Sequence, residues 1–243
     1  MLSDDLRCLW YIMWKDLDAY YFKPPNVSWG ILFPLAFVLA FAIRDPDNLE
    51  GLVPGLLALT LLFGASSMEA IVITFERRIG ALERLLLAPV RLPALLAGKV
   101  LGGAVFALAT TLVVLILALL AFGLSGVNGP LLTLAMLLSA ATFSAMGALI
   151  SVAVKEVFEA QTLANAFRFP MMFLGGVFVP VASLPLGLQI VARLLPLTYA
   201  VEALRAAMTG GSWVTAAVDL CVLVAFAAAF FAAATWALAR RLE

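Results

Sequence analysis

The sequence predicts an all-α integral membrane protein with six transmembrane helices, an N-terminal interfacial amphipathic helix and short re-entrant or interfacial helices on the outer face. Its 243 residues are 65% hydrophobic and 12% charged, with a mean hydropathy of +1.11. A soluble domain carries about 25% charged residues, so this chain cannot cover a comparable water-facing surface. Long charge-free runs recur along it without the alternation of barrel strands. We therefore expect one transmembrane domain over residues 1–243.

Six apolar stretches have about the 20 residues that a helix needs to cross the hydrocarbon core. Each should be helical, because lipid offers no partner for backbone N–H and C=O groups. The charge-free run 100–154 is too long for one span, and turn-forming residues at 123–130 are expected to divide it. The predicted spans are residues 26–43, 52–75, 100–122, 131–154, 161–179 and 220–239.

Lysine and arginine fall mainly on one side of these spans. With the N-terminus inside, twelve of the fifteen basic residues lie in cytoplasmic segments and three lie outside. This bias matches the positive-inside rule, so we expect a multi-pass protein of the cell (inner) membrane with both termini in the cytoplasm. The net charge of zero gives no general attraction to nucleic acid, and membrane lipid is the expected surrounding.

Residues 4–22 form a polar leader in which apolar side chains recur every three or four positions. Trp10, Tyr11 and Trp14 are residue types that favour the lipid headgroup zone. The pattern predicts a helix lying on the inner membrane surface. A disordered polar tail is the alternative.

Residues 180–208 are interrupted by prolines and do not resemble an ordinary span. Residues 186–195 have about half the length needed to cross, and a second short helix is expected near residues 199–208. Non-helical backbone at membrane depth must be buried in protein or line a cavity. We therefore expect an outer re-entrant region, with a long outer loop as the alternative.

Small residues at four-residue spacing indicate close contacts between helices. Gly98 and Gly102 form one such pair, and Ala140, Ser144 and Ala148 form a second series. Both patterns fit packing within one subunit as well as dimerisation.

Glu69 is the one acid well inside a predicted span. Ionisable groups in that position are costly and are often functional. Glu69 is expected to make a polar contact in a pathway or to pair with Arg168; a water-exposed side chain near the inner edge is the alternative.

The chain offers no recognisable catalytic machinery. It contains no histidine, which excludes histidine triads and HExxH metal sites, and the sequence around Lys99 lacks the other residues of a phosphate-binding loop. No catalytic residue, metal ligand or cofactor is expected, and Cys8 and Cys221 should stay unpaired. Energy for transport against a gradient must come from an ion gradient or from another polypeptide.

Residues 76–99 carry seven charges between two apolar runs. They begin with ERRIGALERLLLAPV (76–90), continue to GKVL (98–101), and resemble the cytoplasmic signature between the second and third spans of ABC-2 type permeases. GGVFVP (175–180) and LPLTYAVEALR (195–205) are similar to family segments around the fifth span. The resemblance covers nearly the whole chain. Residues 91–93 depart from the pattern, which leaves the end of the cytoplasmic helix open.

The resemblance implies a half-transporter that pairs with a second copy, as a homodimer, and with two separate ABC ATPase subunits that would carry ATP and Mg. Residues 76–87 would form a coupling helix entering a groove of the ATPase. Its leucines would offer an apolar face, its charges would fix the register, and Gly80 would let the chain change direction. The implied interface residues are Glu76, Arg77, Arg78, Gly80, Leu82, Glu83, Arg84, Leu85 and Leu86.

The resemblance also implies a pathway between the two copies, lined mainly by the second and fifth spans. A wall of methionine and phenylalanine suits a hydrophobic or amphipathic cargo that is drug-like or lipid-like, although the same residues could be ordinary core. The candidate lining residues are Phe63, Ser66, Ser67, Glu69, Met171, Met172 and Phe173.

The expected function is therefore the permease subunit of an ATP-driven ABC exporter that moves such a cargo outward. A permease for a lipid-linked polysaccharide, in the same family, is one alternative. An ion-coupled secondary transporter is another, but it would need several ionisable groups at mid-membrane.

Overall fold

A computed structural model describes residues 2–44, 50–87, 91–122 and 126–241. Helices dominate these residues, and no strand occurs among them. The elements are α1 (Leu2–Asp16), its π-helical continuation η1 (Leu17–Tyr21), α2 (Pro24–Arg44), η3 (Glu50–Leu52), α3 (Val53–Arg78), α4 (Ala81–Leu86), α5 (Leu92–Phe122), α6 (Gly129–Ala153), α7 (Val157–Leu174), η4 (Val181–Ser183), α8 (Leu186–Arg193), α9 (Pro196–Met208) and α10 (Trp213–Arg240).

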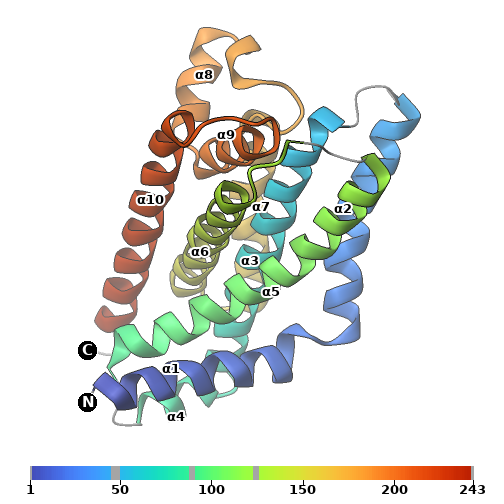
Figure 1. Ribbon diagram of the computed structural model, residues 1–243. Helices are drawn as coiled ribbons and strands as arrows, with labels where there is room; N and C mark the ends of the chain where they lie inside the picture. The colour runs from blue at the N-terminus through green and yellow to red at the C-terminus, as the bar shows by residue number, and fades with distance from the viewer. Residues whose placement is uncertain (1, 45–49, 88–90, 123–125, 242–243) are drawn as a thin grey trace.

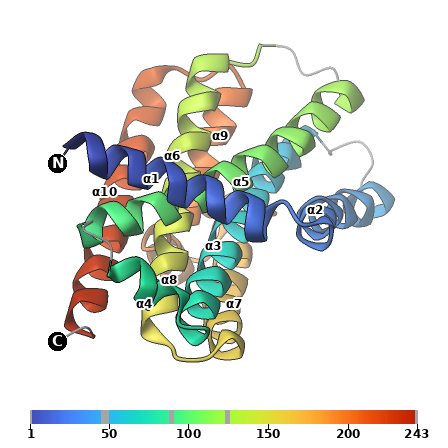
Figure 2. The ribbon, with the colours of Figure 1, turned by 90° about the horizontal axis from the view of Figure 1, so that it is seen from below.

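The long helices form a bundle around α3 and α6 (Figure 1). Helices α5, α7, α9 and α10 pack around this pair, and α2 stands at one edge. The largest apolar cluster lies where α3 meets α6, with Leu57, Leu61 and Phe143 fully buried. Seen from below in Figure 2, α1 crosses the lower end of the bundle against α5.

The helical membrane architecture is confirmed, and four described helices are long and apolar enough to cross a bilayer: α3, α5, α6 and α10. The pair α8 and α9, bent by 89°, passes the same test together and would make a fifth if it is one broken span. A count of six spans requires α2 and α7 to cross as well, and it stays a prediction.

Helices α5, α7 and α10 begin four or more residues earlier than expected, because charged residues lie inside them rather than at their ends. Helix α5 starts at Leu92, and Lys99 within it is buried and ion-paired. Helix α7 starts at Val157, after a capping box formed by Glu156 and Glu159. Helix α10 starts at Trp213 and contains Asp219.

Both short outer helices are present in the segment 180–208. Helix α8 begins directly after Pro185, and α9 begins with Pro196 at its first helical position, where the missing N–H is no loss. Helix α8 rises above the bundle in Figure 1, whereas α9 packs within the upper part of the bundle against α3, α6 and α10. The position of α8 and α9 relative to the membrane stays a prediction, as does that of α1.

Glycines allow the close helix contacts that the sequence indicated, and these contacts are within the chain. A Cβ on Gly98 would lie 3.0 Å from the carbonyl oxygen of Leu9 in α1. A Cβ on Gly147 in α6 would lie 2.6 Å from the carbonyl oxygen of Ser66 in α3. The backbones of α3 and α6 therefore touch with no room for a side chain.

Replacing Gly147 with alanine is expected to lower the thermal unfolding midpoint in detergent. Overpacking of this kind costs about 1–3 kcal/mol, which exceeds the roughly 1 kcal/mol that alanine gains over glycine in a helix. Gly187 in α8 is the matched control, because nothing lies within 4 Å of its Cβ position. Gly187→Ala should leave the midpoint unchanged or raise it. Equal midpoints for both variants would contradict the tight packing of α3 on α6.

Candidate functional site

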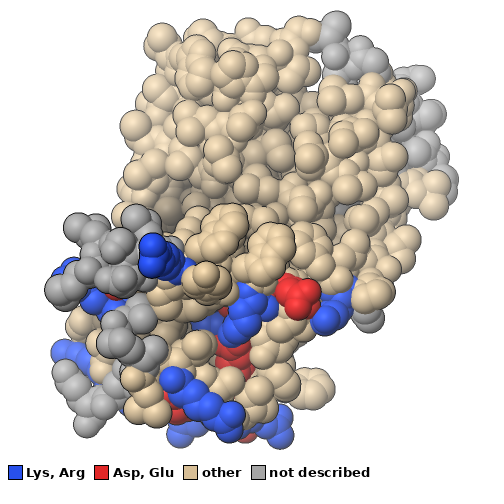
Figure 3. Space-filling view, turned by 60° about the horizontal axis from the view of Figure 1, so that its bottom comes forward, with Lys and Arg blue, Asp and Glu red and all other residues tan. Residues whose placement is uncertain are grey.

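Charged side chains gather at the end of the molecule where α1 and α4 lie (Figure 3). The face shown above this end is almost free of them. The candidate docking segment and a buried ionic cluster both belong to this charged end, and a cavity opens between the helices above it.

The candidate coupling helix is shorter than predicted. Helix α3 continues through Arg78, and Gly80 then adopts a left-handed conformation with φ of 71°. A residue with a side chain rarely adopts this conformation, so glycine permits the turn. The short helix α4 begins at Ala81, not at Glu76. Residues 88–90, in the predicted return to the next span, lie outside the described residues.

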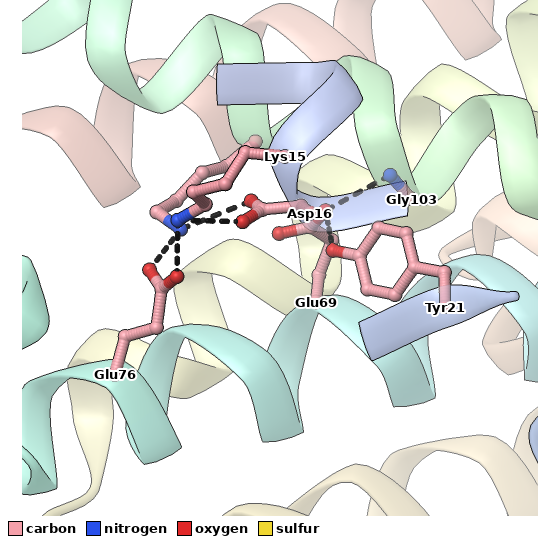
Figure 4. Close-up of polar contacts among 7 residues, drawn as sticks. Lys15, Asp16, Tyr21, Glu69, Glu76 and Gly103 are labelled. Atoms are coloured by element: carbon pink, nitrogen blue, oxygen red, sulfur yellow. Dashed lines mark hydrogen bonds and ion pairs between the residues drawn. The ribbon is translucent and has the colours of Figure 1, made fainter. Parts of the chain in front are cut away.

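Four buried or part-buried charges explain why α3 extends past the expected end. Glu76 is fully buried, and its carboxylate accepts from the ammonium groups of Lys15 and Lys99 (Figure 4). Asp16 lies 3.1 Å from Lys99 Nζ and 2.9 Å from Lys15 Nζ. Two positive and two negative charges compensate each other, and together they connect α1, α3 and α5. Glu76 therefore belongs to this ionic cluster and is not presented at the surface.

Lys15 is the member of the ionic cluster with the most access to water, with a side-chain exposure of 39%. Burial lowers its pKa, but the neighbouring Asp16 and Glu76 more than offset this, so the pKa of Lys15 is raised. Lys15 consequently keeps its charge and helps to neutralise the two carboxylates.

Glu69 lies on α3 farther from the charged end than Glu76 does, and its contacts join α3 to η1 and α5. Its Oε1 accepts from Tyr21 Oη at 2.7 Å and from the Gly103 amide at 3.0 Å (Figure 4). The expected pair with Arg168 is wrong, because the carboxylate is directed toward η1 and α5. A structural tie between η1, α3 and α5 accounts for Glu69.

The exposed residues of the α3–α4 turn form what we call the turn surface: Arg78, Ile79, Glu83, Arg84 and Leu87. Leu82 is buried against the chain's own core, so it anchors α4 instead of facing outward. Leu85 is half-buried on the same core, and the side chain of Leu86 lies outside the described part.

The turn between α6 and α7 lies beside the turn surface. Arg78 Nη1 is 3.4 Å from Glu156 Oε2, and Arg77 donates a hydrogen bond to the Val154 carbonyl. Phe158, at the start of α7, is 89% exposed. A charged rim with isolated apolar side chains therefore spans both turns.

A cavity of about 340 Å³ lies between α2, α3, α5 and α7. Of the candidate pathway residues, Phe63 and Ser67 line it. Ser66 instead donates to the Leu62 carbonyl, and Met171 and Met172 are buried in the main apolar cluster. Phe173 is 62% exposed and contacts Phe178. The lining residues are Asn26, Gly30, Thr60, Phe63, Gly64, Ser67, Met68, Ile71, Phe106, Gln161, Asn165, Arg168 and Phe169.

The polar wall of this cavity was missed by the sequence interpretation. Gln161, Asn165 and Arg168 all line it from α7. Their spacing of four and three residues puts them on one helix face, and this pattern was available in the sequence. Along the sequence, however, the same residues serve equally well to give the fifth span its length, so their spacing alone does not indicate a cavity.

A family model described as "ABC-2 type transporter" matches residues 7–209. The chain is similar to the "Inner membrane transport permease YadH" of Escherichia coli (strain K12), with 29% identity over 196 residues, covering 79% of this chain and 75% of that protein. It is also similar to the "Daunorubicin resistance ABC transporter permease protein DrrB1" of Streptomyces coeruleorubidus, with 28% identity over 240 residues, covering 90% of this chain and 81% of that protein.

Replacing Lys99 with methionine is expected to destabilise the fold by about 3–5 kcal/mol, because removing one partner leaves buried charge uncompensated. Asp16 and Glu76 would then share Lys15 alone. The loss can be measured as a shift in the SDS fraction that unfolds the protein in mixed micelles.

Arg91→Met is the control for Lys99→Met. Arg91 lies 3.9 Å from Asp5, and both side chains are partly exposed, so the effect should stay below about 1 kcal/mol. The double variant Lys99→Met/Glu76→Met loses one charge of each sign and should recover part of the stability. A double variant whose loss equals the sum of the single losses would contradict the pairing.

Proposed function

Because the chain belongs to the ABC-2 type transporter family, whose model matches residues 7–209, we propose that it is the membrane subunit of an ATP-driven exporter. The chain would form a homodimer and bind two separate ABC ATPase subunits, which would hold ATP and Mg and perform the hydrolysis. Its own role is then to receive the ATPase motion and to provide the pathway.

The observation that carries this proposal is the construction of α4. The left-handed turn at Gly80 sets the helix off from α3, and buried Leu82 anchors it from inside. Glu83 and Arg84 consequently stand exposed on a fixed support. Charged groups on a rigid helix can fix the register of a partner, and this supports α4 as the coupling helix.

The turn surface supplies the contacts in this proposal, together with Phe158 from the neighbouring turn. Leu87 is 87% exposed and Phe158 is 89% exposed. Apolar side chains standing free among charges suit a protein contact that buries them. Glu76 and Leu82 act indirectly, because they hold the surface in place from within the chain.

We propose a hydrophobic or amphipathic cargo. The cavity has aromatic and aliphatic walls beside its polar residues, and the relative DrrB1 is named for daunorubicin resistance. The relative YadH is named as an inner membrane protein. The same location suits this chain, with the charged end in the cytoplasm, where the positive-inside rule puts basic residues.

Reversing two exposed charges, Arg78→Glu with Arg84→Glu, should reduce copurification of the partner ATPase. Loss and repulsion of close interface charges weaken binding by about 10- to 100-fold or more. The affinity can be measured between the purified permease and its ATPase at fixed ionic strength. Arg77 is left unchanged, because its guanidinium binds the Val154 carbonyl within the chain.

Arg193→Glu is the matched control for this double reversal. Arg193 is half exposed at the opposite end and pairs with Glu202, so its reversal should leave ATPase binding unchanged. Full ATPase affinity in a correctly inserted Arg78/Arg84 variant would refute docking at the turn surface.

A further inference from the structure

Arg168 is a fully buried cation that lines the cavity. Its Nη1 donates to Ser67 Oγ at 2.5 Å, while Nε and Nη2 have no hydrogen-bond partner in the part of the chain that the structure describes. None of the ion pairs formed among the described residues includes it. A buried charge without a counter-charge is strongly unfavourable. Arg168 is therefore in an arrangement that an anion would stabilise.

The two free donors have the geometry that an oxyanion requires. The Nε–H and Nη2–H groups share one edge of the planar guanidinium, and such an edge binds two oxygens of a carboxylate or phosphate in parallel. Ser67 holds the opposite side of the group, and the ring of Phe63 lies 5.2 Å from Arg168 Cζ. These contacts fix the guanidinium before any ligand arrives.

A second polar atom at this site also lacks a partner. Gln161 lines the cavity from the same helix face, and its buried Oε1 makes no hydrogen bond to any described residue. This oxygen can accept a hydrogen bond from a hydroxyl group next to the anionic centre. Unpartnered buried polar atoms are uncommon in folded proteins. Two residues that carry such atoms, Gln161 and Arg168, line the same cavity.

The rest of the wall indicates what the anion is attached to. Apolar side chains of Met68, Ile71, Phe106 and Phe169 line the cavity beside the polar residues. Its volume of about 340 Å³ lies within the range of small-molecule sites, which is roughly 300–1,000 Å³. The apolar wall offers a small inorganic anion nothing in return for its lost hydration, whereas an apolar chain fits it.

We propose that this cavity binds an anionic amphipath, with its carboxylate or phosphate head on Arg168 and its apolar part along the aromatic wall. The head group could belong to a transported cargo or to an anionic membrane lipid. Its role as a cargo site rests on the proposed export function, whereas binding itself does not require the ATPase.

The test uses the full chain in phosphatidylcholine nanodiscs and a pyrene-labelled fatty acid as the probe, with its methyl ester as the uncharged match. The acid should bind at least about tenfold more tightly than the ester, as expected for loss of charge-assisted hydrogen bonds. R168Q should remove this difference in affinity between acid and ester. R168K should retain part of it, because lysine keeps the positive charge but lacks the paired N–H donors of the guanidinium. R240Q, which alters an arginine stacked on Trp236, is the control and should bind like the unaltered chain.

Equal affinity of the unaltered protein for acid and ester would overturn the proposal, and this comparison needs no variant to fold. Acid binding by well-folded R168Q at unaltered strength would also overturn it. Displacement of the acid by inorganic phosphate alone at similar concentration would refute the apolar part of the ligand.

A further measurement distinguishes a membrane lipid from a transported cargo as the source of the head group. If phosphatidylglycerol in the nanodisc displaces the probe from the unaltered chain, the same site is supported with lipid as its occupant. If it does not, a cargo is supported. Because all these measurements omit the ATPase, they can succeed or fail independently of docking at the turn surface.

Discussion

The ionic cluster of Lys15, Asp16, Glu76 and Lys99 is the constraint on which the lower half of the structure depends. It joins the first helix to the end of α3 and the start of α5, three segments that are far apart in sequence. Moving such charges out of water is costly, and the cost is met here by pairing every charge with its opposite. The pairing positions the end of α3, and thereby the Gly80 turn and the exposed face of α4.

Arg168 is also a buried charge, but its surroundings differ from those of the ionic cluster. Lys99 is surrounded by carboxylates, whereas Arg168 has a serine hydroxyl and an aromatic ring beside it. The first arrangement is complete in itself and suits a fixed structural joint. The second is incomplete within the described residues and suits a site that exchanges its occupant. Full burial alone does not separate these roles; the neighbouring charges do.

Composition and charge placement were sufficient to predict a helical membrane domain and the leading helix. Proline placement indicated the two short helices within residues 180–208, and the family followed from the resemblance of particular motifs, above all residues 76–90. The ends of helices are harder to predict, because a charge such as Lys99 reads as the edge of a span. Its partners come from α1 and α3, and no local pattern shows that these segments meet. The same limit applies to Glu69, whose Oε1 accepts from Tyr21 and whose carboxylate does not pair with Arg168.

The candidate sites show the same limit: the sequence indicates the segments involved but not how these segments pack together. The family signature singled out residues 76–90, but it could not say which of them face outward, since burial of Leu82 depends on α5 and α1 packing beneath it. Cavity residues were predicted from one helix at a time. Phe63 and Ser67 were predicted in this way. The polar face of α7 can be recognised as a cavity wall only when α2, α3 and α5 are seen to enclose it.

Helix α3 runs without a break from the charged end to the outer end, and its 26 residues span about 39 Å. At the end of α3 away from the ionic cluster, a Cβ on Gly55 would lie 2.7 Å from the Val177 carbonyl oxygen, so the helix directly touches the irregular segment before η4. A rigid rod pivoting by about 5° near its middle would displace each tip by roughly 1.7 Å. Because Gly55 has no side chain that could yield against Val177, such a displacement would be passed directly to the segment before η4, at the end of α3 farthest from the ionic cluster.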